Sequence, residues 1–119
     1  MPEPNSRISV SSEGDVTVVE LMDRKILDEV SILHISEQLN SLIVDASAPR
    51  LVVDFTNVDH LSSSALGMLI TLHNCVREKA GRLVLCNIQP GIYEVFAITR
   101  LNDIFTIRNS RAEALAEMD

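Results

Sequence analysis

The three consecutive serines Ser62, Ser63 and Ser64 are the residues of this sequence best suited to chemistry. They follow the apolar segment Leu51–Phe55 and precede a segment whose apolar residues recur with helical spacing. We therefore expect the hydroxyls at a helix N-terminus, where free backbone N–H groups and the positive end of the helix dipole favour negative charge. A phosphate group could be added and removed there, changing the surface while the fold is kept.

Two other interpretations of the serines compete with phosphorylation. In the first, a serine caps the helix by accepting a backbone hydrogen bond worth about 1 kcal/mol. One serine is enough for such a cap, so capping does not account for three in a row. A nucleophilic serine needs a Gly-x-Ser-x-Gly elbow and a histidine held by a carboxylate. Gly is absent before all three serines, and His60, in the same loop, has no orienting partner in the sequence. We expect His34, His60 and His73 to be surface side chains and the protein not to be an enzyme.

Acidic residues and cysteines give no convincing metal pattern. Asp54 and Asp59 could form a carboxylate pair that converges on the serines, with Asp28 nearby. The plainer interpretation is that Asp28 caps a helix and Asp59 begins a turn. Cys75 and Cys86 lack metal or redox spacing and have apolar neighbours, so both are expected to be reduced core residues. The four glycines form no phosphate-binding loop, and we predict no cofactor and no metal.

Composition excludes several classes of partner. The 119 residues have the length of one domain, and 46% hydrophobic residues suffice for its core. Aromatic residues are too scarce, at 3%, for a surface on which nucleic-acid bases stack. The net charge of -7 repels phosphate backbones and anionic lipids. Without an apolar run near the ~18 residues of a membrane span, or a secretory signal, we expect a cytoplasmic protein with no nucleic-acid partner and no membrane insertion.

Strands and helices alternate along the chain in the order ββαβαβαβα. The predicted strands are residues 7–10, 16–21, 51–55, 83–86 and 104–107, and the predicted helices begin after Asp28, after the serines, at Pro90 and after Ser110. The apolar stripe of the first helix consists of Ile32, Ile35, Leu39, Leu42 and Ala46, widened by Leu33 and Ile43. The alternation predicts an α/β fold with mostly parallel pairing, and the opening hairpin makes the central sheet mixed. Residues 1–6 are expected to be a flexible tail and residues 7–119 one domain.

The segment from Leu51 to Gly67 resembles the signature of the STAS domain family, and in particular of bacterial anti-sigma factor antagonists. Members carry a hydrophobic strand and then commonly an Asp-Ser-Ser/Thr-Gly-Leu-Gly box that opens a helix. Ser63 falls on the phosphoacceptor of that box and Ser64 on the hydroxyl after it. The resemblance spans about residues 7–118 and includes Gly81–Pro90, which is similar to the family's next strand, and Lys25–Asp28.

Three positions depart from the family pattern. Ser62 stands where the family usually has Asp, and Ala65 where it usually has Gly. The loss of the carboxylate could alter kinase recognition or the orientation of the acceptor hydroxyl, whereas Ala fits a first helical turn without strain. Lys25 replaces the common Gly before the first helix. Ser62 and Ser64 therefore remain alternative acceptors to Ser63.

The resemblance implies a partner-switching mechanism. The unphosphorylated protein would bind an anti-sigma factor that is also a serine kinase with a histidine-kinase-like ATP domain, and so release a sigma factor. Phosphorylation of Ser63 would dissociate the complex, and a serine phosphatase would reset it. The residues expected to contact the partner are Asp28, Asn57, Asp59, His60, Ser62, Ser64, Thr71, Asn74 and Glu78.

Two alternatives within the family remain open. Some STAS domains are scaffold or regulatory subunits of larger assemblies, stressosome-like particles or lipid-transport ATPases, without a phosphorylation cycle. Some relatives are reported to bind GTP, although this sequence contains no recognisable nucleotide-binding motif.

Overall fold

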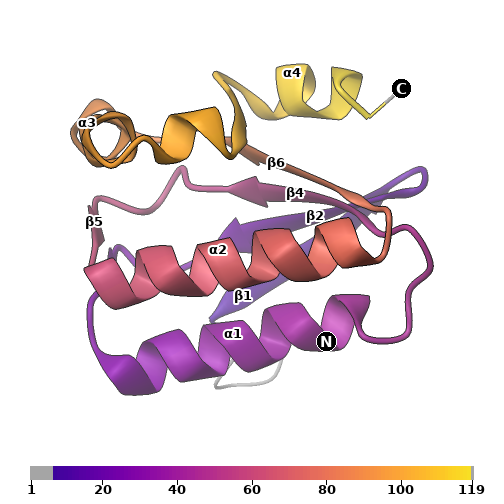
Figure 1. Ribbon diagram of the computed structural model, residues 1–119, viewed down its shortest axis with the longest axis horizontal. Helices are drawn as coiled ribbons and strands as arrows, with labels where there is room; N and C mark the ends of the chain where they lie inside the picture. The colour runs from indigo at the N-terminus through magenta and orange to yellow at the C-terminus, as the bar shows by residue number, and fades with distance from the viewer. Residues whose placement is uncertain (1–6, 119) are drawn as a thin grey trace.

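A five-stranded sheet forms the centre of the computed structural model, which describes residues 7–118 (Figure 1). The first strand runs antiparallel to the second, and the other neighbours pair in parallel. In spatial order the strands are β1 (Ile8–Glu13), β2 (Val16–Leu21), β4 (Arg50–Asp54), β6 (Arg82–Cys86) and β7 (Thr106–Arg108). The predicted mixed sheet is therefore confirmed. The tail predicted over residues 1–6 lies outside the described residues.

The four predicted helices are present, and three very short elements accompany them. The helices are α1 (Glu29–Ile43), α2 (Ser63–Glu78), α3 (Pro90–Ile98) and α4 (Arg111–Ala116). The sequence does not predict the parallel pair of strands β3 (Lys25–Ile26) and β5 (His60–Leu61), nor the 3-10 turn η1 (Leu101–Asp103). Two or three residues are too few for a hydrophobic period to be visible.

Several boundaries and one apolar position differ from the prediction. The first strand covers residues 8–13 instead of 7–10. The last strand covers residues 106–108 instead of 104–107, because Ile104 closes the turn η1 and its side chain is 49% exposed. The first helix ends at Ile43, before Ala46. Leu33, predicted to widen the apolar stripe of α1, faces solvent with 57% of its surface exposed.

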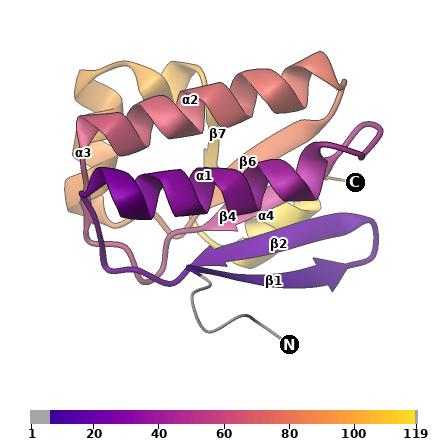
Figure 2. The ribbon, with the colours of Figure 1, turned by 90° about the horizontal axis from the view of Figure 1, so that it is seen from below.

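Side chains of the central strands face two separate apolar cores. Val19 and Leu21 of β2 point into the larger core, to which α1, α2 and α3 contribute, whereas Val16 and Val18 point into a smaller core under α4. Figure 2 shows α1 and α2 side by side on one face of the sheet. Because a buried aliphatic side chain contributes about 1.5–3 kcal/mol, the larger core supplies most of the hydrophobic stabilisation. β2 is thus covered on both faces, in agreement with the apolar residues that its sequence carries on each of them.

The predicted helix caps Asp28 and Ser110 are both confirmed. Asp28 Oδ2 accepts a hydrogen bond from the backbone N–H of Ser31 at 3.0 Å, and Ser110 Oγ accepts one from that of Glu113 at 3.1 Å. The bond from Ser31 stabilises the carboxylate form and thereby lowers the pKa of Asp28. Both helices therefore begin where the sequence places their caps.

Both cysteines are free thiols that contact the apolar cores. Cys86 lies in the smaller core, where burial and then the nearby Asp54 carboxylate raise the pKa of its thiol to about 12. Cys75 is half-buried and packs against the larger core. Since the thiolate is the reactive form, Cys86 is a structural residue at neutral pH.

Candidate functional site

The serine cluster opens α2, as predicted, and its three members have different roles in the structure. Ser62 is the N-cap: its Oγ accepts a hydrogen bond from the backbone N–H of Ala65 at 3.1 Å. Ser63 and Ser64 are the first two helical residues, and both are exposed. The first turn of α2 contains no acidic residue, so a negative charge added there meets the helix N-terminus without a neighbouring carboxylate in that turn.

The short strands β3 and β5 hold the loop in front of the serines. Lys25 pairs with His60 and Ile26 with Leu61, and the N–H of Ser62 donates to the carbonyl of Ile26 at 3.0 Å. The start of α2 is thereby tied to the segment that leads into α1. The N-termini of both helices lie at the same end of the molecule, on the left in Figure 1.

Asp59 links an exposed imidazole to an exposed guanidinium beside the serines. Its Oδ1 lies 2.7 Å from His60 Nδ1, and its Oδ2 lies 3.1 Å from Arg24 Nη2. The hydrogen bond with His60, and then the one with Arg24, lower the pKa of Asp59. The expectation that His60 lacks an orienting partner is therefore wrong. The carboxylate is the adjacent residue in the sequence, and that adjacency was the available signal.

The imidazole of His60 is paired with Asp59 and not with the serines in the described part of the chain. Among residues 7–118 no hydrogen bond joins His60 to Ser62, Ser63 or Ser64, as a general base for a serine would require. His73 also differs from the prediction of a surface residue: it is half-buried, with its ring edge-on to Phe105 at 5.2 Å between centroids. Burial, and then the charge of Arg77, lower its pKa.

Asp54 does not converge with Asp59 on the serines. It is 2% exposed, and its Oδ2 pairs with Arg111 of α4, at 2.8 Å from Nη2. Its Oδ1 accepts hydrogen bonds from Thr56 and Asn87. Burial by itself raises the pKa of Asp54, but these hydrogen bonds outweigh it and hold that pKa below its usual value. Arg111, 57 positions further along the chain, is the residue that sequence reasoning missed.

The partner-facing residues predicted on α2 share its outward side. Thr71, Asn74 and Glu78 are exposed and spaced at three and four residues, and Gly67 lies one turn before Thr71. With Ser63 and Ser64 they form an exposed polar stripe along the helix, which we call the α2 stripe. Asn57 is not part of this stripe: it lies in the loop between β4 and β5, and its half-buried side chain donates a hydrogen bond to Glu20 at 2.7 Å.

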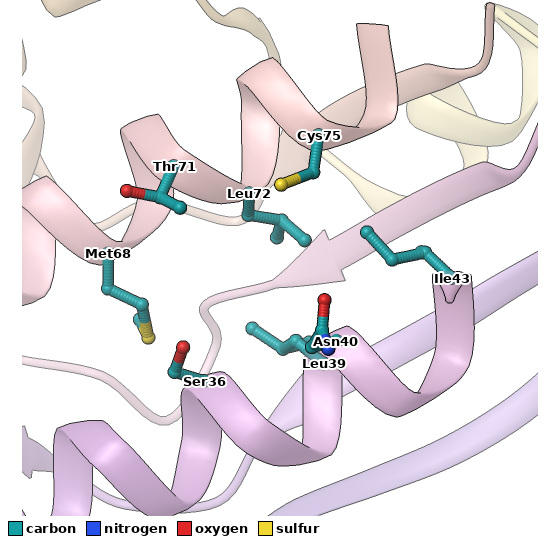
Figure 3. A pocket seen from close by; sticks show the side chains of 8 residues that line it. All are labelled: Ser36, Leu39, Asn40, Ile43, Met68, Thr71, Leu72 and Cys75. Atoms are coloured by element: carbon teal, nitrogen blue, oxygen red, sulfur yellow. The ribbon is translucent and has the colours of Figure 1, made fainter. Parts of the chain in front are cut away.

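A shallow groove separates α1 from α2 (Figure 3). Its volume of about 30 Å³ is room for one or two water molecules, far below that of a nucleotide site. The groove is lined by Ser36, Leu39, Asn40, Ile43, Met68, Thr71, Leu72 and Cys75.

Within the described part of the chain, no group of three or more His, Cys, Asp or Glu side chains is arranged to hold a metal ion. No helix of residues 7–118 is long and apolar enough to cross a membrane.

Comparison of the sequence with known proteins identifies the family of this chain. The sequence profile of the STAS domain matches residues 7–114. BtrV of Bordetella bronchiseptica, a candidate anti-sigma factor antagonist, is 36% identical over 84 residues, which are 68% of this chain and 72% of BtrV. The chain therefore belongs to the STAS domain family, as its signature segment indicates.

Solved structures with the same fold include anti-sigma factor antagonists. The STAS domain protein of Planctomyces limnophilus, an anti-sigma-factor antagonist, matches with a TM-score of 0.85 and 23% identity, over 93% of this chain and 97% of that one. Phosphorylated SpoIIAA of Bacillus matches with a TM-score of 0.71 and 18% identity, over 94% of this chain and 99% of that one. At these identities the match shows the fold. The names of the relatives, taken with the fold, support the function of an anti-sigma factor antagonist.

Proposed function

We propose that this protein binds an anti-sigma factor that is also a serine kinase, and that phosphorylation of Ser63 ends the interaction. The observation that carries the proposal is the position of Ser63, which is exposed as the first residue of α2 while Ser62 caps the helix. A phosphate on Ser63 would then leave the cap intact. SpoIIAA, whose fold is similar, has been solved in a phosphorylated form.

The departures from the family box are compatible with this role. Ser62 replaces the usual Asp, and both residue types cap a helix by accepting a backbone N–H bond. Ala65 replaces the usual Gly, and its methyl group is fully buried in the larger core. The helix therefore keeps its start and gains a residue of higher helix propensity.

The switch is electrostatic. A phosphoserine carries about −1.5 to −2 charges, which the N-terminus of α2 tolerates in the free protein. The same dianion in a packed interface meets repulsion and desolvation. Converting a complex from 99:1 to 1:99 takes about 5.5 kcal/mol of differential affinity, which one buried and unpaired phosphate can supply. A serine phosphatase would restore binding.

The contact surface that we propose combines three neighbouring parts of the molecule. They are the loop from Asn57 to Ser62, the start of α1 at Asp28 and the α2 stripe. The loop brings Asp59 and His60, and the stripe brings Ser64, Thr71 and Asn74. We expect the protein to act in the cytoplasm, where bacterial transcription takes place.

A kinase assay tests the acceptor directly. Incubated with labelled ATP and a lysate of its native cells, the wild-type protein and a Ser64→Ala variant are expected to take up phosphate, and a Ser63→Ala variant is not. Ser63 is the residue expected to react because it is exposed and not needed for the cap. Undiminished labelling of Ser63→Ala would move the site to another residue and refute the assignment.

Gly67→Ala is expected to stabilise the protein yet weaken partner binding. A Cβ at Gly67 meets no atom within 4 Å, so the change stabilises the helix by about 0.5–1 kcal/mol. The same methyl group would stand on the α2 stripe, between the helix backbone and the partner, and lower the affinity. Urea unfolding and a binding titration measure the two effects. Gly91→Ala, also free of contacts but on α3, is the matched control and should bind normally.

A further inference from the structure

A connected network of six polar side chains lies between α4 and the loop that precedes the serines: Glu20, Asp54, Thr56, Asn57, Asn87 and Arg111. Its centre is a pair of acidic residues: Glu20 and Asp54 are direct neighbours in the register of β2 and β4. Two carboxylates in such a position repel each other. Arg111 bridges them, with its Nη2 at 3.2 Å from Glu20 Oε1 and 2.8 Å from Asp54 Oδ2. Within residues 7–118 no other cation forms an ion pair with either carboxylate.

Each of these carboxylates gives one oxygen to Arg111 and the other to the loop. Asp54 Oδ1 accepts the backbone N–H of Thr56 at 2.9 Å, together with the Thr56 hydroxyl. Glu20 Oε2 accepts the side-chain amide of Asn57 at 2.7 Å. The arginine therefore helps to orient both carboxylates and, through them, two consecutive loop residues, alongside the hydrogen bonds from Asn87 to Asp54 Oδ1 and from Asn57 to the carbonyl of Leu21.

The network is one of several contacts that hold the loop before β5 begins: Asn57 also donates to the carbonyl of Leu21 at 3.2 Å, and the side chains of Phe55 and Val58 are buried in the larger core. After Asn57 the chain turns, with the N–H of Val58 bonded to the carbonyl of Phe55 at 2.9 Å, and reaches β5 and the cap Ser62 within five residues. The N–H of Asp59 donates to the carbonyl of Arg24 at 2.8 Å. A shift at Thr56 and Asn57 is thus transmitted directly to the residues that present Ser63.

We propose that Arg111 is a positioning residue for the phosphoacceptor loop: by holding Glu20 and Asp54 it fixes Thr56 and Asn57, and so couples α4 to the surface that carries Ser63. The effect on loop order follows from the network alone. The effect on phosphorylation rests on the function proposed above.

The opposite end of α4 supplies a matched control. Arg108 pairs with the carboxylate of Glu117 at 2.6 Å, and Arg82 donates to the carbonyl of Glu117 at 2.8 Å. These contacts hold α4 in place without touching the loop. Arg108→Gln therefore tests what a weakened α4 does by itself, and Arg111→Gln tests the loss of the bridge.

Amide hydrogen exchange measures the coupling without any partner. In Arg111→Gln the amides of residues 55–60 are expected to exchange about tenfold faster than in the wild type, whereas in Arg108→Gln only residues 111–118 should do so. Arg111→Lys, which keeps the charge, should restore loop protection to within about threefold of the wild type. Unchanged loop exchange in Arg111→Gln, or equal acceleration in Arg108→Gln, would overturn the proposal.

Two further measurements keep the outcome decisive. If Arg111→Gln does not fold, Asn57→Ala cuts the same connection at the loop, and it should accelerate exchange in residues 55–60 while α4 stays protected; an unaffected loop refutes the coupling. In the kinase assay with native-cell lysate, Arg111→Gln should lower kcat/KM about tenfold, mainly through KM, because a disordered loop docks poorly. If the wild-type protein takes up no phosphate, the proposed function is contradicted. The coupling of Arg111 to the loop is then still tested by hydrogen exchange alone.

Discussion

Replacing Ser63 with aspartate is expected to lower the affinity for the anti-sigma factor about 100-fold, or about 2.8 kcal/mol. The substitution puts a fixed negative charge on the first residue of α2, in the centre of the proposed contact surface. A charge buried in an interface without a partner typically costs about 3–5 kcal/mol, so a loss of about 2.8 kcal/mol corresponds to a carboxylate that keeps part of its hydration in the complex. A calorimetric titration with the purified anti-sigma factor measures the change.

The fold should not change in the same variant. The helix N-terminus stabilises a carboxylate, and the cap at Ser62 stays in place, so circular dichroism and the unfolding midpoint should match those of the wild type. Ser63→Ala supplies the neutral control and should bind normally. Wild-type affinity of Ser63→Asp would contradict the charge-based switch.

Asp54→Ala is expected to destabilise the protein by about 3–5 kcal/mol, a large part of the roughly 5–15 kcal/mol that stabilises a domain of this size. Asp54 is buried, and its removal takes from Arg111 one of its two carboxylate partners and leaves the amides of Thr56 and Asn87 without this acceptor. Urea unfolding at neutral pH gives the free energy directly. A loss below 1 kcal/mol would show that the Arg111 network contributes little.

The same residue gives the stability a defined dependence on pH. In the folded protein the pKa of Asp54 is lowered, so its contribution is fully present above the unfolded value of about 3.9 and is lost as pH falls through the folded pKa. We therefore expect the unfolding free energy of the wild type to drop below about pH 4, and that of Asp54→Asn to drop less steeply. Parallel curves for the two proteins would assign acid unfolding to other carboxylates.

The sequence predicts the regular parts of this fold because they depend on local patterns. Apolar residues on both faces of Val16–Leu21 and the apolar run Leu51–Phe55 identify interior strands, and caps such as Asp28 and Ser110 mark helix starts. Two-residue strands such as His60–Leu61 have no such pattern. They exist because tertiary structure brings two loops together.

The residues of the candidate site also differ in whether local sequence patterns reveal them. The serine cluster at the start of α2 could be recognised from sequence, since cap and helix are contiguous. The pair Asp54–Arg111 could not, because a contact between residues 57 positions apart leaves no local signal. The pair Asp59–His60 is an intermediate case: the residues are adjacent, but their contact depends on side-chain rotamers that sequence spacing does not determine.

Phosphopeptide mass spectrometry on the protein isolated from its native cells tests the central claim most directly. Trypsin should release residues 51–77, which contain all three serines of the cluster. We predict that a fraction of this peptide carries phosphate on Ser63 and that the fraction changes between growth and stress. A peptide that is unmodified under every condition would contradict phosphorylation control and favour a constitutive STAS subunit whose serines only begin a helix.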